Sequence, residues 1–235
     1  MDCIPNNLTM QDMGRHAVTL LHHHQLQVTS VIVVGHSMGT MIATEIAIQA
    51  LNVVIGIALI DGSRVARGNL EEAIAKSNAG FQQMGFAGCI ENTFMPMFQP
   101  SSDEKEKKRI IDRAYAQPEA ISIEKLSSAI RWCASDFECQ YRQLKVPVQV
   151  VQSTHIHSRG EGSKRVPATV EMHIGWHLEL KSFGVDAEFD FVPDCGHFIM
   201  LDKPEVVNAN IARLLKRIDS AAAAGCSSCS YTISI

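Results

Sequence analysis

The sequence lacks the segments that carry a chain into or across a membrane. No apolar run approaches the roughly 18 residues that a spanning helix needs. The opening stretch, MDCIPNNLTMQDMGRH, has no basic part followed by an apolar part, so it does not resemble a secretory signal. We therefore expect a cytoplasmic protein with no membrane partner.

An excess of positive charge is also missing. The 235 residues include 21 Lys and Arg against 25 Asp and Glu, a formal net charge of −4. Nucleic-acid-binding domains are usually basic, so no nucleic-acid partner is expected. Hydrophobic residues make up 46% of the chain, as expected of an ordinary soluble globular protein. The length suits one domain, or one core with a sizeable insertion. A small molecule is the expected partner, and a homo-oligomer is an open alternative.

Cysteine is present without a regular pattern. There are seven, an odd and scattered number that favours reduced thiols over a disulfide framework. The CxxC spacing of residues 226–229 lies in a tail of small residues and favours a frayed end over a metal site. No third ligand accompanies the pair His173 and His177, and His155 and His157 are interpreted as loop residues. We predict no metal and no cofactor.

Short apolar runs alternate with amphipathic segments near both ends of the chain. Strand, helix and strand within about thirty residues form a βαβ unit, which predicts a parallel sheet. The expected strands are residues 31–34, 53–60, 146–151 and 187–192. The expected helices are residues 10–24, 38–51, 171–183 and 204–218, with a polar loop at 153–170.

The middle of the chain differs from both ends. Residues 64–144 contain charged helical segments and a Met/Phe-rich stretch, without a strand pattern. We interpret this part as a helical lid inserted into a core formed by residues 1–63 and 145–220. Residues 221–235 are expected to be a flexible tail.

The pattern Gly35-His36-Ser37-Met38-Gly39 joins the first strand to the first small-residue helix. A serine hydroxyl attacks a carbonyl only when a base takes its proton and donors stabilise the oxyanion. Small residues on both sides of Ser37 permit a sharp turn that exposes it, and the helix N-terminus favours negative charge. The Met38 N–H is then placed as an oxyanion donor. The alternative is an ordinary serine in a glycine-rich turn.

A base is expected on a loop after a later strand. His197 follows the strand at 187–192 and precedes the last helix, and Gly196 permits a tight turn. The other histidines fit this position less well: residues 22–24 read as a solvated helix end, and His36 lies inside the serine turn, where it packs or orients a neighbour. His197 is therefore the predicted base.

Two carboxylates compete for the third position of a catalytic triad, which orients the base. Asp61 ends the strand that follows the serine turn. Glu161 is the first carboxylate after the strand at 146–151. We predict Asp61, with Glu161 as the alternative; a plain turn residue before Gly62 is the other interpretation of Asp61.

Together these features resemble the α/β-hydrolase superfamily: GHSMG after VIVV, a helical insertion after the next strand, and DCGHF before a final amphipathic helix. The resemblance covers about residues 8–218 and is closest to the lidded branch of esterases, lactonases, carbon–carbon bond hydrolases and cofactor-free haloperoxidase-like proteins. It implies an α/β fold with a mostly parallel sheet, with Ser37 as nucleophile and His197 as base. In most members the acid follows the strand that here ends near Gln152; in some it stands where Asp61 does.

The resemblance also carries one departure. In the family, several strands and a His-Gly type segment with the second oxyanion donor precede the serine turn, whereas about 30 residues that fit one helix precede it here. We therefore expect an N-terminally shortened core.

The expected function is hydrolysis of an ester, lactone or activated carbon–carbon bond in a partly apolar substrate. His36, Phe94 and Phe98 are the predicted substrate contacts, and simple lid packing is the alternative for the two phenylalanines. The alternatives for the whole chain are a non-catalytic or weakly active binding protein and an inactive shortened product that folds poorly.

Overall fold

The structure is a computed structural model that describes residues 8–23, 28–64, 69–157, 165–167 and 178–225. Its centre is a four-stranded sheet in the order β1-β2-β3-β6, with all three neighbouring pairs parallel. The strands are β1 (Val31–His36), β2 (Val54–Ile60), β3 (Val148–Ser153) and β6 (Ala187–Val192). The predicted α/β class with a parallel sheet is confirmed, and the four strands lie where the apolar runs predicted them.

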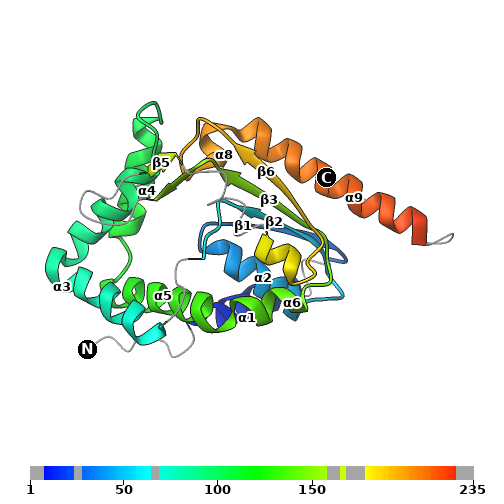
Figure 1. Cartoon of the computed structure of the whole chain (residues 1–235), viewed down its shortest axis with the longest axis horizontal. Coiled ribbons are helices and arrows are strands. Elements are labelled where there is room, and N and C mark those ends of the chain that lie inside the picture. Colours follow the sequence, from blue (N-terminus) through cyan, green and yellow to red (C-terminus); the bar gives the residue numbers. More distant parts are fainter. Residues whose placement is uncertain (1–7, 24–27, 65–68, 158–164, 168–177, 226–235) are drawn as a thin grey trace.

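Helices cover both faces of this sheet (Figure 1). One face packs against α2 (Gly39–Gln49), which in turn packs against α1 (Met10–Leu21) and α6 (Phe137–Gln143). The other face packs against α9 (Pro204–Gly225), which follows the short helix α8 (Ile199–Asp202). Apolar side chains therefore form two separate clusters, one on each side of the sheet.

A long helical segment separates β2 from β3. Its elements are α3 (Leu70–Phe94), the 3₁₀ turn η1 (Met95–Met97), α4 (Glu104–Tyr115), α5 (Glu119–Arg131), the π-helical turn η2 (Trp132–Asp136) and α6. α3 is interrupted at Gly85, whose φ of 68° is readily adopted only by glycine. Much of this segment lies to one side of the sheet in Figure 1.

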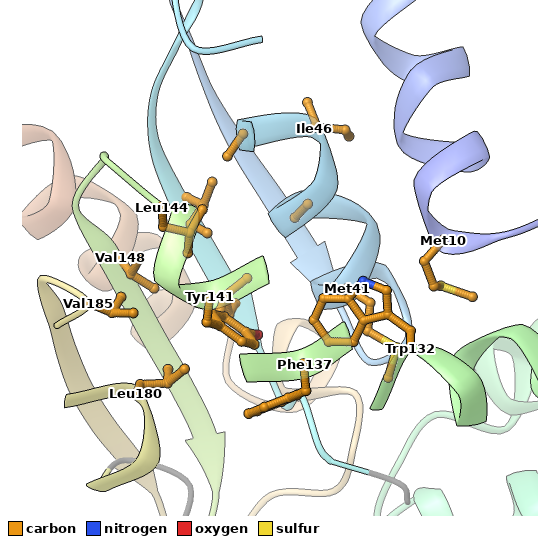
Figure 2. Close-up of a cluster of buried hydrophobic side chains, with 14 of the residues drawn as sticks. Met10, Met41, Ile46, Trp132, Phe137, Tyr141, Leu144, Val148, Leu180 and Val185 are labelled. Carbon is orange, nitrogen blue, oxygen red and sulfur yellow. The ribbon is translucent and has the colours of Figure 1, made fainter. Parts of the chain in front are cut away.

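The last part of this segment belongs to the main core. It buries three large aromatic side chains, Trp132, Phe137 and Tyr141, which are each about 1% exposed. They belong to the same buried cluster as Met10 of α1 and Met41 of α2 (Figure 2). Residues 132–144 thus pack with the parts of the chain that we assigned to the core. The end of α5 joins the same core through Ala129 and Ile130, so the expected lid of residues 64–144 shares its last elements with the core.

Three details of the sequence prediction were wrong. α1 ends at Leu21, with His22 as its C-cap, rather than near His24. The region predicted as a polar loop contains the antiparallel pair β4 (His155–His157) and β5 (Arg165–Pro167), each with a β-branched residue at its centre. α9 extends to Gly225 through a run of alanines, the best helix formers, so residues 221–225 are helix rather than tail.

Residues 226–235, including the CxxC pair, lie outside the described residues. Among the helices that the structure describes, none is long and apolar enough to cross a bilayer.

Candidate active site

Ser37 lies in a strained turn at the carboxyl end of β1. Its φ is 56°, a left-handed value that is uncommon for a residue other than glycine. Its N–H donates to the carbonyl of Ile60 at the end of β2 (2.9 Å), and its own carbonyl accepts from the Thr40 N–H (3.0 Å). The backbone therefore holds Ser37 firmly in a conformation that costs energy, as is common where function requires it.

The two glycines of the turn are not equivalent. A Cβ atom on Gly35 would lie 2.2 Å from the carbonyl oxygen of Gly39, which no side chain could occupy without moving the backbone. A Cβ on Gly39 would have no atom within 4 Å. The sequence predicted that small residues on both sides of Ser37 permit the turn, whereas the close approach of strand and helix requires glycine only at residue 35.

Met38 connects the serine turn to α2. It has helical backbone angles and directly precedes the first residue of the helix. Like the first N–H groups of any helix, the Met38 N–H has no acceptor within the helix. In the described part of the chain it donates to no other group. The geometry thus leaves a donor, aided by the helix dipole, beside the serine.

Asp61 and His197 form a buried pair. His197 Nδ1–H donates to Asp61 Oδ2 over 2.6 Å, and the two side chains are 9% and 2% exposed. Asp61 also has a left-handed φ, of 43°, and follows β2 as Ser37 follows β1. Because the bond occupies Nδ1, the Nε2 atom of this imidazole is the one left for a substrate or a nucleophile.

Asp61 has further partners that sequence reasoning missed. Its Oδ1 accepts from Gln152 Nε2 (2.6 Å) and from the Ser153 N–H (2.9 Å). Both donors end β3, the strand after which the more usual acid was sought. The end of β3 supplies hydrogen bonds to the carboxylate of β2 instead of a carboxylate of its own. A pair of polar residues closing an apolar strand was the signal available in the sequence.

The serine turn and the Asp61 turn pack directly against each other. Gly62 lies so close to Thr40 that a Cβ atom there would meet its Oγ1 at 2.9 Å. Register agrees with this contact, since His36 pairs with Ile60 and each strand then turns at the next residue. The structure therefore brings Ser37, Asp61 and His197 to one edge of the sheet.

His36 supports the loop of His197. Its Nε2–H donates to the His197 carbonyl (2.8 Å), and the two rings lie 4.5 Å apart. Phe198 also stacks against Phe98 at 4.8 Å. His36 and Phe98, two of the predicted substrate contacts, thus pack against the histidine loop. Neither of them lines the cavity beside Met38.

The histidine loop is bonded to the helical segment. The His197 N–H donates to the carbonyl of Met97 (2.8 Å), and the Gly196 N–H donates to Asp202 Oδ2 (2.7 Å). Asp202 Oδ1 accepts from Ser102 Oγ at 3.1 Å, which ties the stretch after η1 to the same carboxylate. Asp202, the last residue of α8, therefore connects two loops.

A cavity of about 280 Å³ opens next to the serine turn. Met38 lines it together with residues of α3, α4 and α5, among them Phe94, the third predicted substrate contact. Cys89 forms part of the wall; burial and the nearby Glu119 carboxylate raise the pKa of its thiol, which keeps it protonated. The walls are mainly apolar, as in pockets for small organic molecules.

Some predicted residues lie outside the described part of the chain. These are Glu161, the alternative acid, and the pair His173 and His177. Within the described ranges, no group of three or more His, Cys, Asp or Glu side chains is placed to hold a metal ion.

Comparison with known proteins gives one family match. The profile described as the alpha/beta hydrolase family matches residues 4–210. A search of curated proteins finds no significant match.

Solved structures with similar folds are numerous. An enol-lactonase from Burkholderia xenovorans LB400 is 16% identical, with a TM-score of 0.64 over 88% of this chain and 73% of the other. MenH from S. aureus is 16% identical, with a TM-score of 0.65 over 93% and 79%. A thermophilic esterase from Thermogutta terrifontis is 18% identical, with a TM-score of 0.60 over 92% and 75%. At these identities the likeness establishes the fold.

Proposed function

The chain belongs to the alpha/beta hydrolase family, and on that premise we propose that it is a serine hydrolase with Ser37 as nucleophile, His197 as base and Asp61 as the orienting acid. The observation that carries the proposal is the buried 2.6 Å contact between Asp61 and His197 at the strand ends beside the strained Ser37. Hydrolysis as the reaction class is supported by similar structures, which include an enol-lactonase and an esterase.

In the proposed acylation step, His197 Nε2 takes the proton of Ser37 as the hydroxyl oxygen bonds to the substrate carbonyl carbon. The Met38 N–H stabilises the oxyanion, and one such donor is worth roughly 10²–10³ in rate. Asp61 holds the imidazole in the required tautomer and stabilises its cation. The bond to the leaving group then breaks, and His197 returns the proton to the leaving atom, which is oxygen in an ester or lactone and carbon in a carbon–carbon bond.

The second proposed step releases the acyl group. Water attacks the Ser37 ester while His197 takes its proton, and the acid product leaves with free Ser37 restored. We propose that the substrate carries an ester, a lactone or an activated carbon–carbon bond. The rest of the substrate would be partly apolar, because a mainly apolar cavity reaches Met38. α3 to α5 would act as the lid that encloses it. A small-molecule partner, a cytoplasmic location and self-association belong to the same proposal.

A labelling experiment tests the role of Ser37. We expect a fluorophosphonate probe to form an adduct that peptide mass mapping places on Ser37, and p-nitrophenyl butyrate to be hydrolysed. Both signals should disappear in Ser37→Ala. Folded protein without a Ser37 adduct, or turnover that persists in Ser37→Ala, would reject the proposal. Ligand binding without turnover in the wild type would favour the non-catalytic alternative.

A further inference from the structure

We propose that the cavity beside Met38 selects substrates with an anionic group, which the ammonium group of Lys125 binds at the cavity mouth. The inference rests on the proposed function in treating the bound molecule as the substrate of Ser37. It concerns the part of the substrate that does not react, and it therefore specifies a substrate class.

The walls of the cavity are polarised. Aromatic and aliphatic side chains such as Phe81, Phe86, Ile90 and Phe94 line it from α3. Gln117, Ser122 and Lys125 line it from the α4–α5 corner, and Thr93 of α3 adds one hydroxyl to the apolar wall. Lys125 is the one charged side chain among the described lining residues. A ligand that fills this space meets apolar surface along its length and a positive charge at the corner.

Lys125 differs from most of its cationic neighbours. On α4 and α5 each of four other cations has a carboxylate partner, and the pairs are Lys107–Glu104, Lys108–Asp112, Arg109–Glu106 and Arg131–Glu124. Lys105 and Arg113 have no such pair in the described residues, but they do not line the cavity. Among the described residues, Lys125 is bonded to Gln117, whose Oε1 accepts from Nζ at 3.1 Å. An ammonium group carries three protons, so it can also donate to an anion.

The position of Lys125 suits binding without a large desolvation cost. Gln117 is exposed and Lys125 is half-buried, so this corner forms the solvent side of the cavity. A charge there keeps part of its hydration, unlike a fully buried ion pair. The cavity of about 280 Å³ has room for a small organic molecule. We infer an ester or lactone with a carboxylate or similar monoanion beyond a short apolar chain.

Two matched esters test the inference without turnover. In Ser37→Ala, isothermal titration calorimetry compares monomethyl suberate, which carries one carboxylate, with dimethyl suberate, which carries none. We expect the anionic ester to bind roughly threefold to tenfold more tightly, as for a half-exposed charged contact. High salt should weaken that preference.

Charge variants identify the residue responsible. The preference should be lost in Ser37→Ala/Lys125→Gln and kept in Ser37→Ala/Lys125→Arg. Ser37→Ala/Lys105→Gln removes the same charge from an exposed site outside the cavity and should keep it.

The outcomes separate the two proposals. Equal affinity for the two esters, no measurable binding of either, or a preference that survives Lys125→Gln would overturn the anionic site. A preference that depends on Lys125, in a wild type that fluorophosphonate fails to label, would support the anionic site and reject the hydrolase.

Discussion

Asp61 and Asp194 both lie close to the histidine loop, and of these two Asp61 reaches the imidazole. Asp61 accepts the proton of His197 Nδ1, whereas Asp194 is exposed in the loop itself. We predict that Asp61→Asn lowers kcat on p-nitrophenyl butyrate by about 10³–10⁴, because an amide no longer enforces the required tautomer. Steady-state kinetics on folded variants would measure the loss.

Asp194→Asn is the matched control. Its backbone φ of 54° tolerates asparagine as well as aspartate, so the same chemical change should leave kcat within about twofold of the wild type. Equal losses in the two variants would show that the Asp61 carboxylate has no special role.

The two glycines beside Ser37 lead to a prediction about stability. Gly35→Ala places a Cβ against the Gly39 carbonyl, so it should lower the free energy of unfolding by at least about 1–3 kcal/mol. Gly39→Ala meets open space and should change it by less than about 1 kcal/mol. Urea denaturation followed by circular dichroism would compare them, and equal destabilisation would contradict the close strand–helix approach.

At the residue scale, sequence and structure agree on positions and differ on partners. Ser37 and Asp61 were predicted because each follows a recognisable apolar strand, and His197 because it lies between the last strand and the last helix. The hydrogen bonds of Gln152 and Ser153 to Asp61 were not predicted, because they depend on which strand ends are neighbours. The spacing of the strands along the chain does not determine which strands are neighbours in a parallel sheet.

At the scale of elements, Asp202 joins the histidine loop to the stretch that follows η1. We predict that Asp202→Ala lowers kcat by roughly tenfold, because small displacements of a catalytic group are costly. Amide hydrogen exchange should also increase in residues 97–102 and 196–198, where the lost bonds lie. Mass spectrometry of both segments would detect the change.

Asp112→Ala serves as the reference for Asp202→Ala. It removes an exposed carboxylate of α4 paired with Lys108, far along the same helical segment. Exchange in both loops and kcat should remain as in the wild type. If Asp202→Ala leaves exchange in both loops unchanged, the bridging role is wrong.

The elements were predictable to different degrees. Strands buried in the sheet appear as apolar β-branched runs, and α9 appears as a long amphipathic repeat, so both could be read directly. The β4–β5 pair is too short to give a clear alternation. The cavity was not predictable in shape, because α3, α4 and α5 contribute walls from residues far apart in the chain.

At the scale of the whole molecule, a buried carboxyl connects the core to the end of the helical segment. Glu45 of α2 is 1% exposed, and its Oε1 accepts from Trp132 Nε1 at 2.6 Å. Burial raises the pKa of Glu45 above its usual value, with a further contribution from the negative charge of Asp136, although the Trp132 and Gln49 hydrogen bonds oppose the rise.

This carboxyl predicts a pH dependence of stability. Because the pKa of Glu45 is raised in the folded state, its contribution to the free energy of unfolding is complete below about pH 4.5. That contribution is lost as the pH rises through the pKa of the folded state. Glu45→Gln, which still accepts from Trp132, should therefore unfold at a higher temperature than the wild type near pH 7. The difference should shrink toward pH 4.

Thermal unfolding across that pH range would measure the effect. Glu104→Gln, at a side chain that is 83% exposed, should follow the wild-type curve at every pH. A gap between Glu45→Gln and wild type that is constant with pH would show that Glu45 does not titrate differently in the folded state.

The left-handed residues at the carboxyl edge of the sheet have a consequence for engineering. Ser37, Asp61 and Asp194 each follow a strand there, and none is glycine. Each such position costs on the order of 1 kcal/mol or more, which the rest of the fold must offset. The conformation that the proposed reaction needs at Ser37 therefore lowers the stability of the fold. Ser37→Gly, which also lacks the proposed nucleophile, should unfold at a higher temperature than Ser37→Ala. A designer who wants only the scaffold would begin at this edge of the sheet.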